Sequence, residues 1–210
     1  MTTFAHEEIP TTIQEQKPTE GPTEAEFDPE YKHPFQYKWV VWEHRNDCEN
    51  YADNIQPVCE FDTVEVFWTY WHHLPQPVDF FFAPRQSRKT ISNRSVVSYS
   101  IFREKIKPEW EDPVACKGGE WRIRRFKNLD DVNHIWEEIT LLVLGCSLKC
   151  NENIIGVRVV DSSHPTTNKA MYNVEIWFDD MDCAEDIKNS IGENIPELDI
   201  SKMYLRSHSG

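Results

Sequence analysis

The stretch AMYNVEIWF, residues 170–178, indicates the fold class because its side chains alternate between two chemically different faces. Successive side chains of a β-strand point to opposite sides of the sheet. We expect one face to form the core, and it carries Tyr172, Val174, Ile176 and Phe178. Trp177 falls on the other face, beside Asn173 and Glu175. A tryptophan among polar residues is a candidate ligand contact, and packing beneath a loop is the alternative.

Similar segments on either side of this strand predict a sheet. Strand-forming residues recur in segments 37–45, 97–103, 120–127, 154–161 and 198–206. In the third of these, Glu120, Arg122 and Arg124 point away from the face that holds Trp121 and Ile123. Strands and helices occur here without strict βαβ alternation and without a glycine fingerprint. The sequence therefore predicts an α+β fold with a curved, mainly antiparallel sheet and three helices.

The three helices are predicted from capping residues and apolar periodicity. Asp62 and Glu65 have capping-box spacing and predict a helix over residues 62–73. A second helix spans residues 131–144 and ends at Gly145, and a third spans residues 182–191 before Gly192. The first helix is apolar around most of its circumference, so one core face cannot bury all of it. We expect the remainder to meet loops or a partner, such as an amphipathic peptide helix.

Charge and cysteine content narrow the function classes. The net charge is −14, and residues 1–30 hold eight acidic residues and one lysine, which leaves −14 − (−7) = −7 for the rest. We expect residues 1–30 to form a disordered acidic tail and residues 31–210 to form one domain. Such a chain is not expected to grip a phosphate backbone, so RNA binding would rely on a base or an end. Six scattered cysteines without a zinc pattern indicate reduced thiols and a cytosolic or nuclear protein.

The long connection of residues 75–96 contains three consecutive phenylalanines and several basic residues. A mobile surface loop is one interpretation, and a contact surface for RNA or a partner is the other. In either case the three phenylalanines must be shielded from solvent, by this chain or by a partner.

The proline-flanked segment 108–113 pairs Trp110 with Glu111, and this pair carries the clearest chemical signal in the chain. A guanine methylated at N7 carries a delocalised positive charge, which stacks well on an electron-rich indole. Its edge offers two adjacent N–H donors that one carboxylate can accept together. The segment is therefore a candidate site for a cationic purine.

These features together resemble the eukaryotic translation initiation factor 4E family, which binds the messenger-RNA cap. The resemblance covers about residues 33–208 and rests on matching segments in a matching order. They are His33-Pro34-Phe35-Gln36 with Trp39 and Trp42, Phe61 to Glu65 with Phe67 and Trp68, Lys107-Pro108 with Trp110 to Asp112, Gly118-Gly119 with Trp121, Trp136 to Gly145, and Ile176-Trp177. The resemblance implies a cupped-hand fold, a sheet backed by three helices on its convex face, and a role in translation without cofactors or metals.

In this family the methylated base lies between two aromatic plates in the concave face. The resemblance implies that Trp110 and Tyr51 are the plates, that Glu111 reads the guanine edge, and that Trp177 touches the N7-methyl group. Tyrosine in place of the usual second tryptophan resembles the 4E-homologous branch of the family.

The cap phosphates raise a difficulty, because Glu120 stands where the family usually has a basic residue. A carboxylate there would repel the triphosphate unless nearby cations compensate. The candidate cations are Lys117, Arg122, Arg158 and Lys169. We therefore expect weaker dependence on the triphosphate than is typical of the family.

The resemblance also implies a partner surface on the convex face. Six residues align with positions that hold a Tyr-x-x-x-x-Leu-hydrophobic helix of 4G-type scaffolds or 4E-binding repressors: His33, Pro34, Val64, Trp68, Glu138 and Leu141. Both kinds of partner use this surface, so the sequence leaves activation and repression of translation open.

Two other functions remain possible at this point. One is an adaptor with a lapsed cap pocket, which Glu109, Glu120 and Tyr51 favour. The other is a hydrolase using Glu109, Glu111 and Asp112, although adjacent acids on a loop are more often a solvated cluster.

Overall fold

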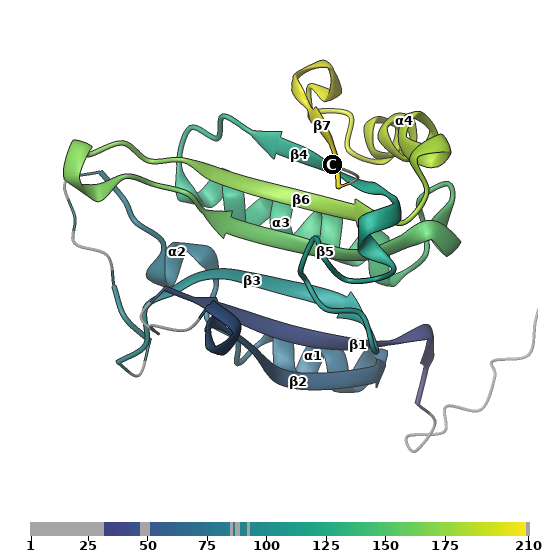
Figure 1. Cartoon of the computed structure of the whole chain (residues 1–210), viewed down its shortest axis with the longest axis horizontal. Coiled ribbons are helices and arrows are strands. Elements are labelled where there is room, and N and C mark those ends of the chain that lie inside the picture. The colour runs from purple at the N-terminus through teal and green to yellow at the C-terminus, as the bar shows by residue number, and fades with distance from the viewer. Residues whose placement is uncertain (1–31, 47–50, 85, 87–88, 92, 209–210) are drawn as a thin grey trace, which may run out of the picture. The chain divides into compact units, whose positions relative to one another are not determined.

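The computed structural model describes residues 32–46, 51–84, 86, 89–91 and 93–208, without the side chains of residues 51 and 52. The predicted tail of residues 1–30 lies outside the described residues. Residues 32–208 form one antiparallel sheet whose strands follow the order β2-β1-β3-β5-β6-β4-β7 (Figure 1). The strands are β1 (Pro34–Arg45), β2 (Ile55–Thr63), β3 (Val96–Arg103), β4 (Gly119–Arg124), β5 (Ile154–Asp161), β6 (Tyr172–Phe178) and β7 (Tyr204–Ser207).

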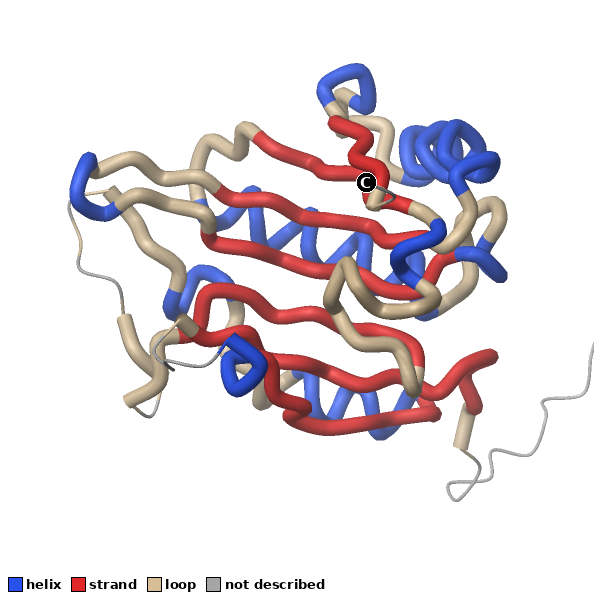
Figure 2. Tube along the Cα trace, viewed as in Figure 1, coloured by secondary structure: helices blue, strands red, loops and turns tan. Residues whose placement is uncertain are grey.

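Four α-helices occur among the described residues: α1 (Val64–Trp71), α2 (Pro77–Phe80), α3 (Leu129–Leu144) and α4 (Ala184–Asn194). Figure 2 shows α1 and α3 running behind the sheet, on the face opposite the viewer. The rings of Trp71 and Trp136 join these two helices, with centroids 5.9 Å apart. The alternation predicted for β4 and β6 is confirmed, because Trp121, Ile123, Val174 and Ile176 all lie in the core beneath the helices.

The predicted α+β class is confirmed, but several boundaries were wrong. The strand β2 was not predicted, because it lies at the sheet edge, contains Pro57 and shows few buried positions. β4 ends at Arg124, before the predicted residue 127, because Arg125 adopts a left-handed φ of 67°. The predicted strand over residues 198–206 contains a short 3-10 helix, η6 (Ile200–Lys202), and only its last part pairs in β7.

The helix starts also differ from those predicted. Thr63 is the N-cap of α1, and the Glu65 carboxylate accepts hydrogen bonds from His33 instead of completing a capping box. A single turn of 3-10 helix, η5 (Met181–Cys183), precedes α4, and α4 continues through Gly192 to Asn194. At α1 a tertiary hydrogen bond replaced the local capping box, whereas before α4 the Asp180 side chain accepts from the Asp182 N–H and so caps the chain locally.

The three phenylalanines of the 75–96 connection are buried in the domain itself. Phe80, Phe81 and Phe82 are each no more than 3% exposed. Phe81 stacks on Tyr172, and the Tyr172 hydroxyl donates a hydrogen bond to the carbonyl of Phe82. These rings are therefore shielded from solvent by the same chain. They do not form the contact surface that was one interpretation of this segment.

The face of the sheet away from the helices carries ionisable groups that are buried or partly buried. At its centre the guanidinium of Arg158 donates to Ser98 Oγ and to His44 Nδ1, each at 2.9 Å. Burial, reinforced by the charge of Arg158, lowers the pKa of His44 to about 4. The folded state therefore holds this imidazole neutral at pH values where an unfolded chain would protonate it.

This arrangement predicts a pH-dependent stability. Between about pH 6.5 and pH 4 the unfolded state binds the additional proton at His44, so stability falls as the pH is lowered through this window. From pH 7 to pH 5 we expect His44 to cost the wild type about 1–2 kcal/mol of unfolding free energy. The asparagine of a His44→Asn variant can accept the Arg158 hydrogen bond but cannot titrate, so this variant should lack that loss. Urea denaturation at both pH values measures the difference, and equal losses in the two proteins would contradict the assignment.

Candidate functional site

The loop between β3 and β4 displays Trp110 and Glu111 on the surface, and Asp112 holds this loop in shape. The Asp112 carboxylate accepts hydrogen bonds from the backbone N–H of Lys107 at 3.0 Å and of Val114 at 2.9 Å. Asp112 is only 9% exposed, whereas Trp110 is 38% exposed and Glu111 is also exposed. Asp112 is thus a structural anchor, which argues against its role in the hydrolase considered from sequence. The loop presents an indole and a carboxylate side by side.

A cation already stacks on the indole. The guanidinium carbon of Arg206, on β7, lies 3.7 Å from the centre of the Trp110 ring. This contact shows that Trp110 attracts a positive group over its face, as the predicted cap chemistry requires. Sequence reasoning missed Arg206. Its signal lies in the sheet register, which pairs Arg206 with Glu120 and so places both on the face away from the helices.

Trp177 lies on that same face but is fully buried. Its ring packs 5.3 Å from Phe102 and 4.3 Å from His208, measured between centroids, and its Nε1 donates to Glu175 Oε2 at 3.2 Å. A Cβ at Gly156 would lie 2.5 Å from the Phe102 ring, so glycine is needed for this packing. The contact between Trp177 and an N7-methyl group remains a prediction, and it requires His208 to move aside.

His208 connects the end of the chain to this site, and sequence reasoning missed it as well. Its Nδ1 lies 2.9 Å from the carbonyl oxygen of Ala115, and its Nε2 lies 3.1 Å from Glu120 Oε2. Its backbone N–H donates to the carbonyl of Gly118 at 3.0 Å. Both ring nitrogens face oxygen acceptors, so a protonated imidazole can donate to both. His208 thereby ties the C-terminal strand to the end of the tryptophan loop.

The carboxylate of Glu120 is not directed toward solvent. It is completely buried and is bound by Arg122 and His208. Burial alone would raise the pKa of Glu120, but the hydrogen bond from His208 and the charge of Arg122 outweigh burial and lower it. Because this carboxylate is buried and paired, it is not placed to repel the cap triphosphate, contrary to the expectation from sequence.

The four cations predicted to meet the phosphates fall into two groups. Arg122 and Arg158 lie among the ionisable groups on the face of the sheet away from the helices, where they flank the buried carboxylate of Glu175. Burial raises the pKa of Glu175, and the charge of Arg158 opposes that effect. Lys117 and Lys169 are exposed and remain available to an anion. Their contact with phosphates stays a prediction.

The second aromatic residue predicted to stack on the cap base is Tyr51. The backbone of Tyr51 opens the short 3-10 helix η1 (Tyr51–Asn54) between β1 and β2. Its side chain lies outside the described residues, so the pairing of Tyr51 with Trp110 stays a prediction.

The residues predicted to bind a partner helix come together on the opposite face. His33 is joined to the start of α1 by its carbonyl, which accepts from the Val64 N–H at 2.9 Å, and by its ring, 2.7 Å from the Glu65 carboxylate. His33 and Pro34 are exposed, and Val64, Trp68, Glu138 and Leu141 are partly exposed. The last four lie on α1 and α3, which are adjacent through Trp71 and Trp136.

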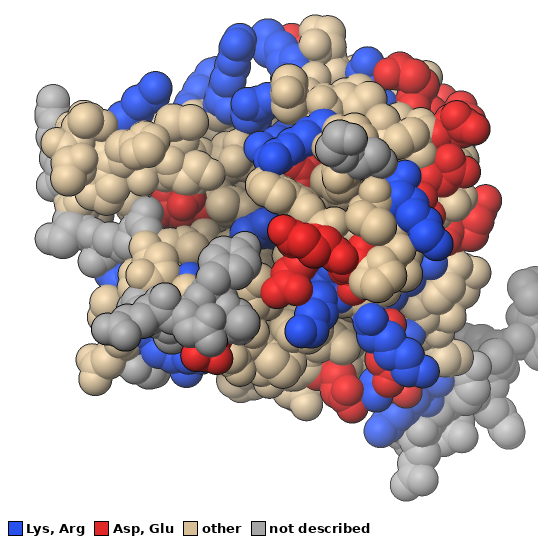
Figure 3. Space-filling model, viewed as in Figure 1, with Lys and Arg blue, Asp and Glu red and all other residues tan. Residues whose placement is uncertain are grey.

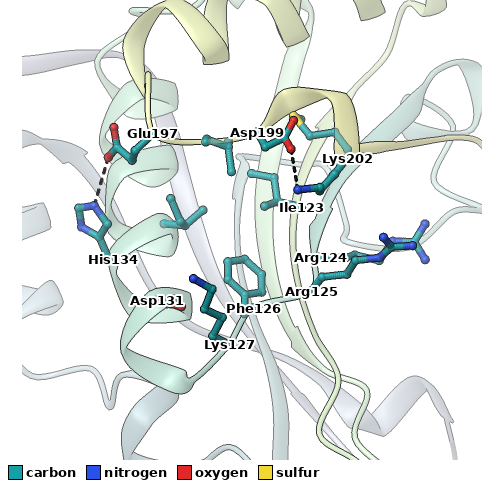
Figure 4. Close-up of a pocket in the computed structure, with 13 residues that line it drawn as sticks. Ile123, Arg124, Arg125, Phe126, Lys127, Asp131, His134, Glu197, Asp199 and Lys202 are labelled. Atoms are coloured by element: carbon teal, nitrogen blue, oxygen red, sulfur yellow. Dashed lines mark ion pairs between the residues drawn. The ribbon is translucent and has the colours of Figure 1, made fainter.

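Two cavities lie away from Trp110, near the end of β4. One, of about 590 Å³, is lined by residues of β4, α3 and the segment before β7, and Figure 4 shows the His134–Glu197 and Lys202–Asp199 ion pairs at its rim. The other, of about 680 Å³, shares Arg124, Arg125 and Lys202 with the first. Within the described part of the chain, no group of three or more His, Cys, Asp or Glu residues could hold a metal ion. None of the described helices is long and apolar enough to cross a membrane.

Comparison with known proteins identifies the family. The family model of eukaryotic initiation factor 4E matches residues 34–208. Eukaryotic translation initiation factor 4E of Candida albicans is 29% identical over 187 residues, which are 84% of this chain and 80% of the relative. Eukaryotic translation initiation factor NCBP of rice (Oryza sativa subsp. japonica) is 33% identical over 129 residues, or 60% of this chain, and the match spans half the length of that relative.

Solved structures agree with this match. The C. elegans eIF4E-3 in complex with the 4E-binding protein Mextli has a TM-score of 0.69 at 23% identity, and the match covers 85% of this chain and 94% of that one. The Ascaris suum eIF4E-3 in complex with an m2,2,7G cap has a TM-score of 0.62 at 26% identity, with 85% and 93% coverage. The expected cupped-hand fold is thus confirmed, and the chain belongs to the eukaryotic initiation factor 4E family.

Proposed function

We propose that this protein binds the 7-methylguanosine 5′ cap of mRNA and links it to a translation initiation scaffold or to a repressor. The observation that carries the proposal is the display of Trp110 beside Glu111 on a loop whose shape is fixed by Asp112. Stacking on one such plate contributes roughly 1–3 kcal/mol per base. The Ascaris relative that was solved with a methylated cap supports the assignment.

The function we propose is recognition without catalysis. Asp112, one of the three acids considered for a hydrolase, has its carboxylate committed to backbone N–H groups of its own loop. The matched relatives have names of initiation factors. For such a role we propose a cytoplasmic location, where translation starts, and the cysteine pattern is equally compatible with the nucleus.

A specific observation favours a second candidate, an adaptor that acts only through protein contacts. Arg206 covers one face of Trp110, and His208 covers Trp177, so two of the predicted cap contacts are occupied by the chain itself. In this alternative the pocket has lapsed and the C-terminal strand fills it. Cap binding by the wild type decides between the two candidates.

We expect the wild-type protein to be retained on immobilised 7-methylguanosine triphosphate and to be released by free cap analogue. Trp110→Ala removes the plate and should weaken binding by about ten- to a hundredfold. Glu111→Gln removes the charge-assisted acceptor and should cost a similar factor. Fluorescence titration with 7-methylguanosine triphosphate gives both dissociation constants.

The neighbouring carboxylate provides a matched control for this test. Glu109→Gln makes the same chemical change two residues away and should leave cap affinity within about twofold, since surface changes are usually small. Failure of the wild type to bind any cap nucleotide would reject cap binding and support the adaptor.

The convex face supplies the partner-binding half of the proposal. Trp68 is partly exposed on α1 and stacks on His72, with ring centroids 5.5 Å apart. Leu141 on the neighbouring α3 is partly buried against the core and still partly exposed. A partner helix with i, i+5 and i+6 apolar anchors can lie across two adjacent helices in this way. The structures of C. elegans eIF4E-3 with Mextli and of schistosome eIF4E with m7GpppG and 4E-BP support such an interface.

Trp68→Ala should therefore weaken binding of a peptide with the Tyr-x-x-x-x-Leu-hydrophobic pattern by at least tenfold, because buried aromatic anchors dominate such interfaces. The same variant should keep the wild-type affinity for cap nucleotide, and Trp110→Ala should keep the wild-type affinity for the peptide. Calorimetric titrations of both variants with both ligands test this reciprocity. Loss of both activities in either variant would show that the two surfaces are not independent.

A further inference from the structure

The larger of the two cavities near the end of β4 is strongly basic, although the protein as a whole is acidic. Arg124, Arg125, Lys169 and Lys202 line it, and none of its described lining residues is an Asp or Glu. Lys202 is paired with Asp199 at 2.7 Å, whereas Arg125 and Lys169 are exposed. A basic cavity of about 680 Å³ in a chain with a net charge of −14 is a local positive site that would attract an anionic ligand.

The backbone arranges two of these cations in an unusual way. Consecutive residues of a strand point to opposite faces, but Arg125 has a left-handed φ of 67° at the point where β4 ends. Figure 4 shows the side chains of Arg124 and Arg125 pointing to the same side, away from the His134–Glu197 pair. Local strain of this kind concentrates at binding sites, and here both arginines line the same cavity.

The strand β7 connects the cavity with the region of Trp110, because Tyr204 lines the cavity and Arg206 contacts Trp110. Arg206 stacks on Trp110, and Tyr204 lies two residues earlier on the same face of β7, about 7 Å away. The guanidinium of Arg124 lies 4.2 Å from the centre of the Tyr204 ring, which is 50% exposed. Two separate cation–π pairs, Trp110 with Arg206 and Tyr204 with Arg124, thus occur along β7, and the second pair lines the cavity.

Other surfaces near Trp110 carry acidic side chains, which would repel a polyanion. Glu109 and Glu111 flank Trp110 itself. Figure 3 shows Asp and Glu side chains gathered at the right-hand edge, around α4, and Lys and Arg side chains at the upper left, where Figure 1 places the end of β4. A positively charged groove with exposed aromatic rings is the general solution for binding single-stranded nucleic acid.

We propose that the first nucleotides of the mRNA after the cap run along β7 and bind in this basic cavity. The proposal rests on the proposed cap-binding function. Their phosphates would contact Arg124, Arg125 and Lys169, and a base would stack on the open face of Tyr204. Asn173 also lines the cavity and supplies a polar group for base edges.

The test compares three ligands by fluorescence anisotropy or competition: 7-methylguanosine triphosphate, a capped pentanucleotide RNA and the same RNA without a cap. We expect the wild type to bind the capped RNA about tenfold more tightly than the nucleotide, with an advantage that shrinks as salt increases. An Arg124→Ser/Arg125→Ser variant should lose that advantage and keep the wild-type affinity for the nucleotide. Loss of two phosphate contacts should also reduce the salt slope by about 1.4.

A matched control removes the same charge elsewhere. Lys32→Ser/Lys149→Ser changes two exposed lysines outside the cavity and should retain the full advantage of the capped RNA. Equal affinity of the wild type for capped RNA and cap nucleotide would overturn the proposal, as would equal losses in the two double variants. Tyr204→Ala gives an uncharged check, because it should weaken binding of the RNA and not of the nucleotide.

The uncapped RNA separates failure of this inference from failure of the proposed function. If the wild type does not bind cap nucleotide, cap binding is rejected, and the cavity is then judged by the uncapped RNA alone. Weak binding of that RNA that disappears in Arg124→Ser/Arg125→Ser would support the cavity as an RNA site. Binding that is unchanged in the variant, or displacement by an acidic peptide but not by uncapped RNA, would overturn it.

Discussion

The buried carboxylate of Glu120 is the interaction on which the organisation of the binding face depends. Its cross-strand neighbours are Trp177 on β6 and Arg206 on β7. Its carboxylate is paired with the side chains of Arg122 and His208. A buried carboxylate is strongly destabilising unless it is paired and hydrogen-bonded. The strand β7 leads to His208 at this carboxylate, and the same strand brings Arg206 to Trp110.

This arrangement gives the C-terminal strand two roles in the binding of a ligand. Arg206 holds the indole of Trp110 by a cation–π contact, and His208 covers Trp177. A cap nucleotide that reaches Trp177 has to displace the His208 ring, and it then competes with the hydrogen bonds that this ring makes to Ala115 and Glu120. The affinity for the base is thus linked to the position of His208. The same strand continues through Tyr204 toward the basic cavity, so one element connects both parts of the binding face.

Much of the fold could be predicted from the sequence. Alternation in residues 170–178 and 120–124 identified the core face, because side-chain direction in a strand follows from local geometry. The amphipathic helix near residues 131–144 was placed within two residues of its observed start. The edge strand β2 and the true N-terminus of α1 were missed. Pairing of an edge strand and the hydrogen bond between Glu65 and His33 both join segments that are distant in sequence.

The candidate site divides in the same way. The sequence by itself determined the chemistry: an indole beside a carboxylate in a proline-flanked loop, and a family pattern over residues 33–208. Only the tertiary structure decided which groups are available to a ligand. It enclosed Glu120 and Trp177, assigned Asp112 to the loop backbone, and gathered Arg124, Arg125 and Lys169 around one cavity. The physical reason is that burial and charge pairing depend on contacts between strands and loops remote in the chain, whereas residue chemistry and alternation are local properties.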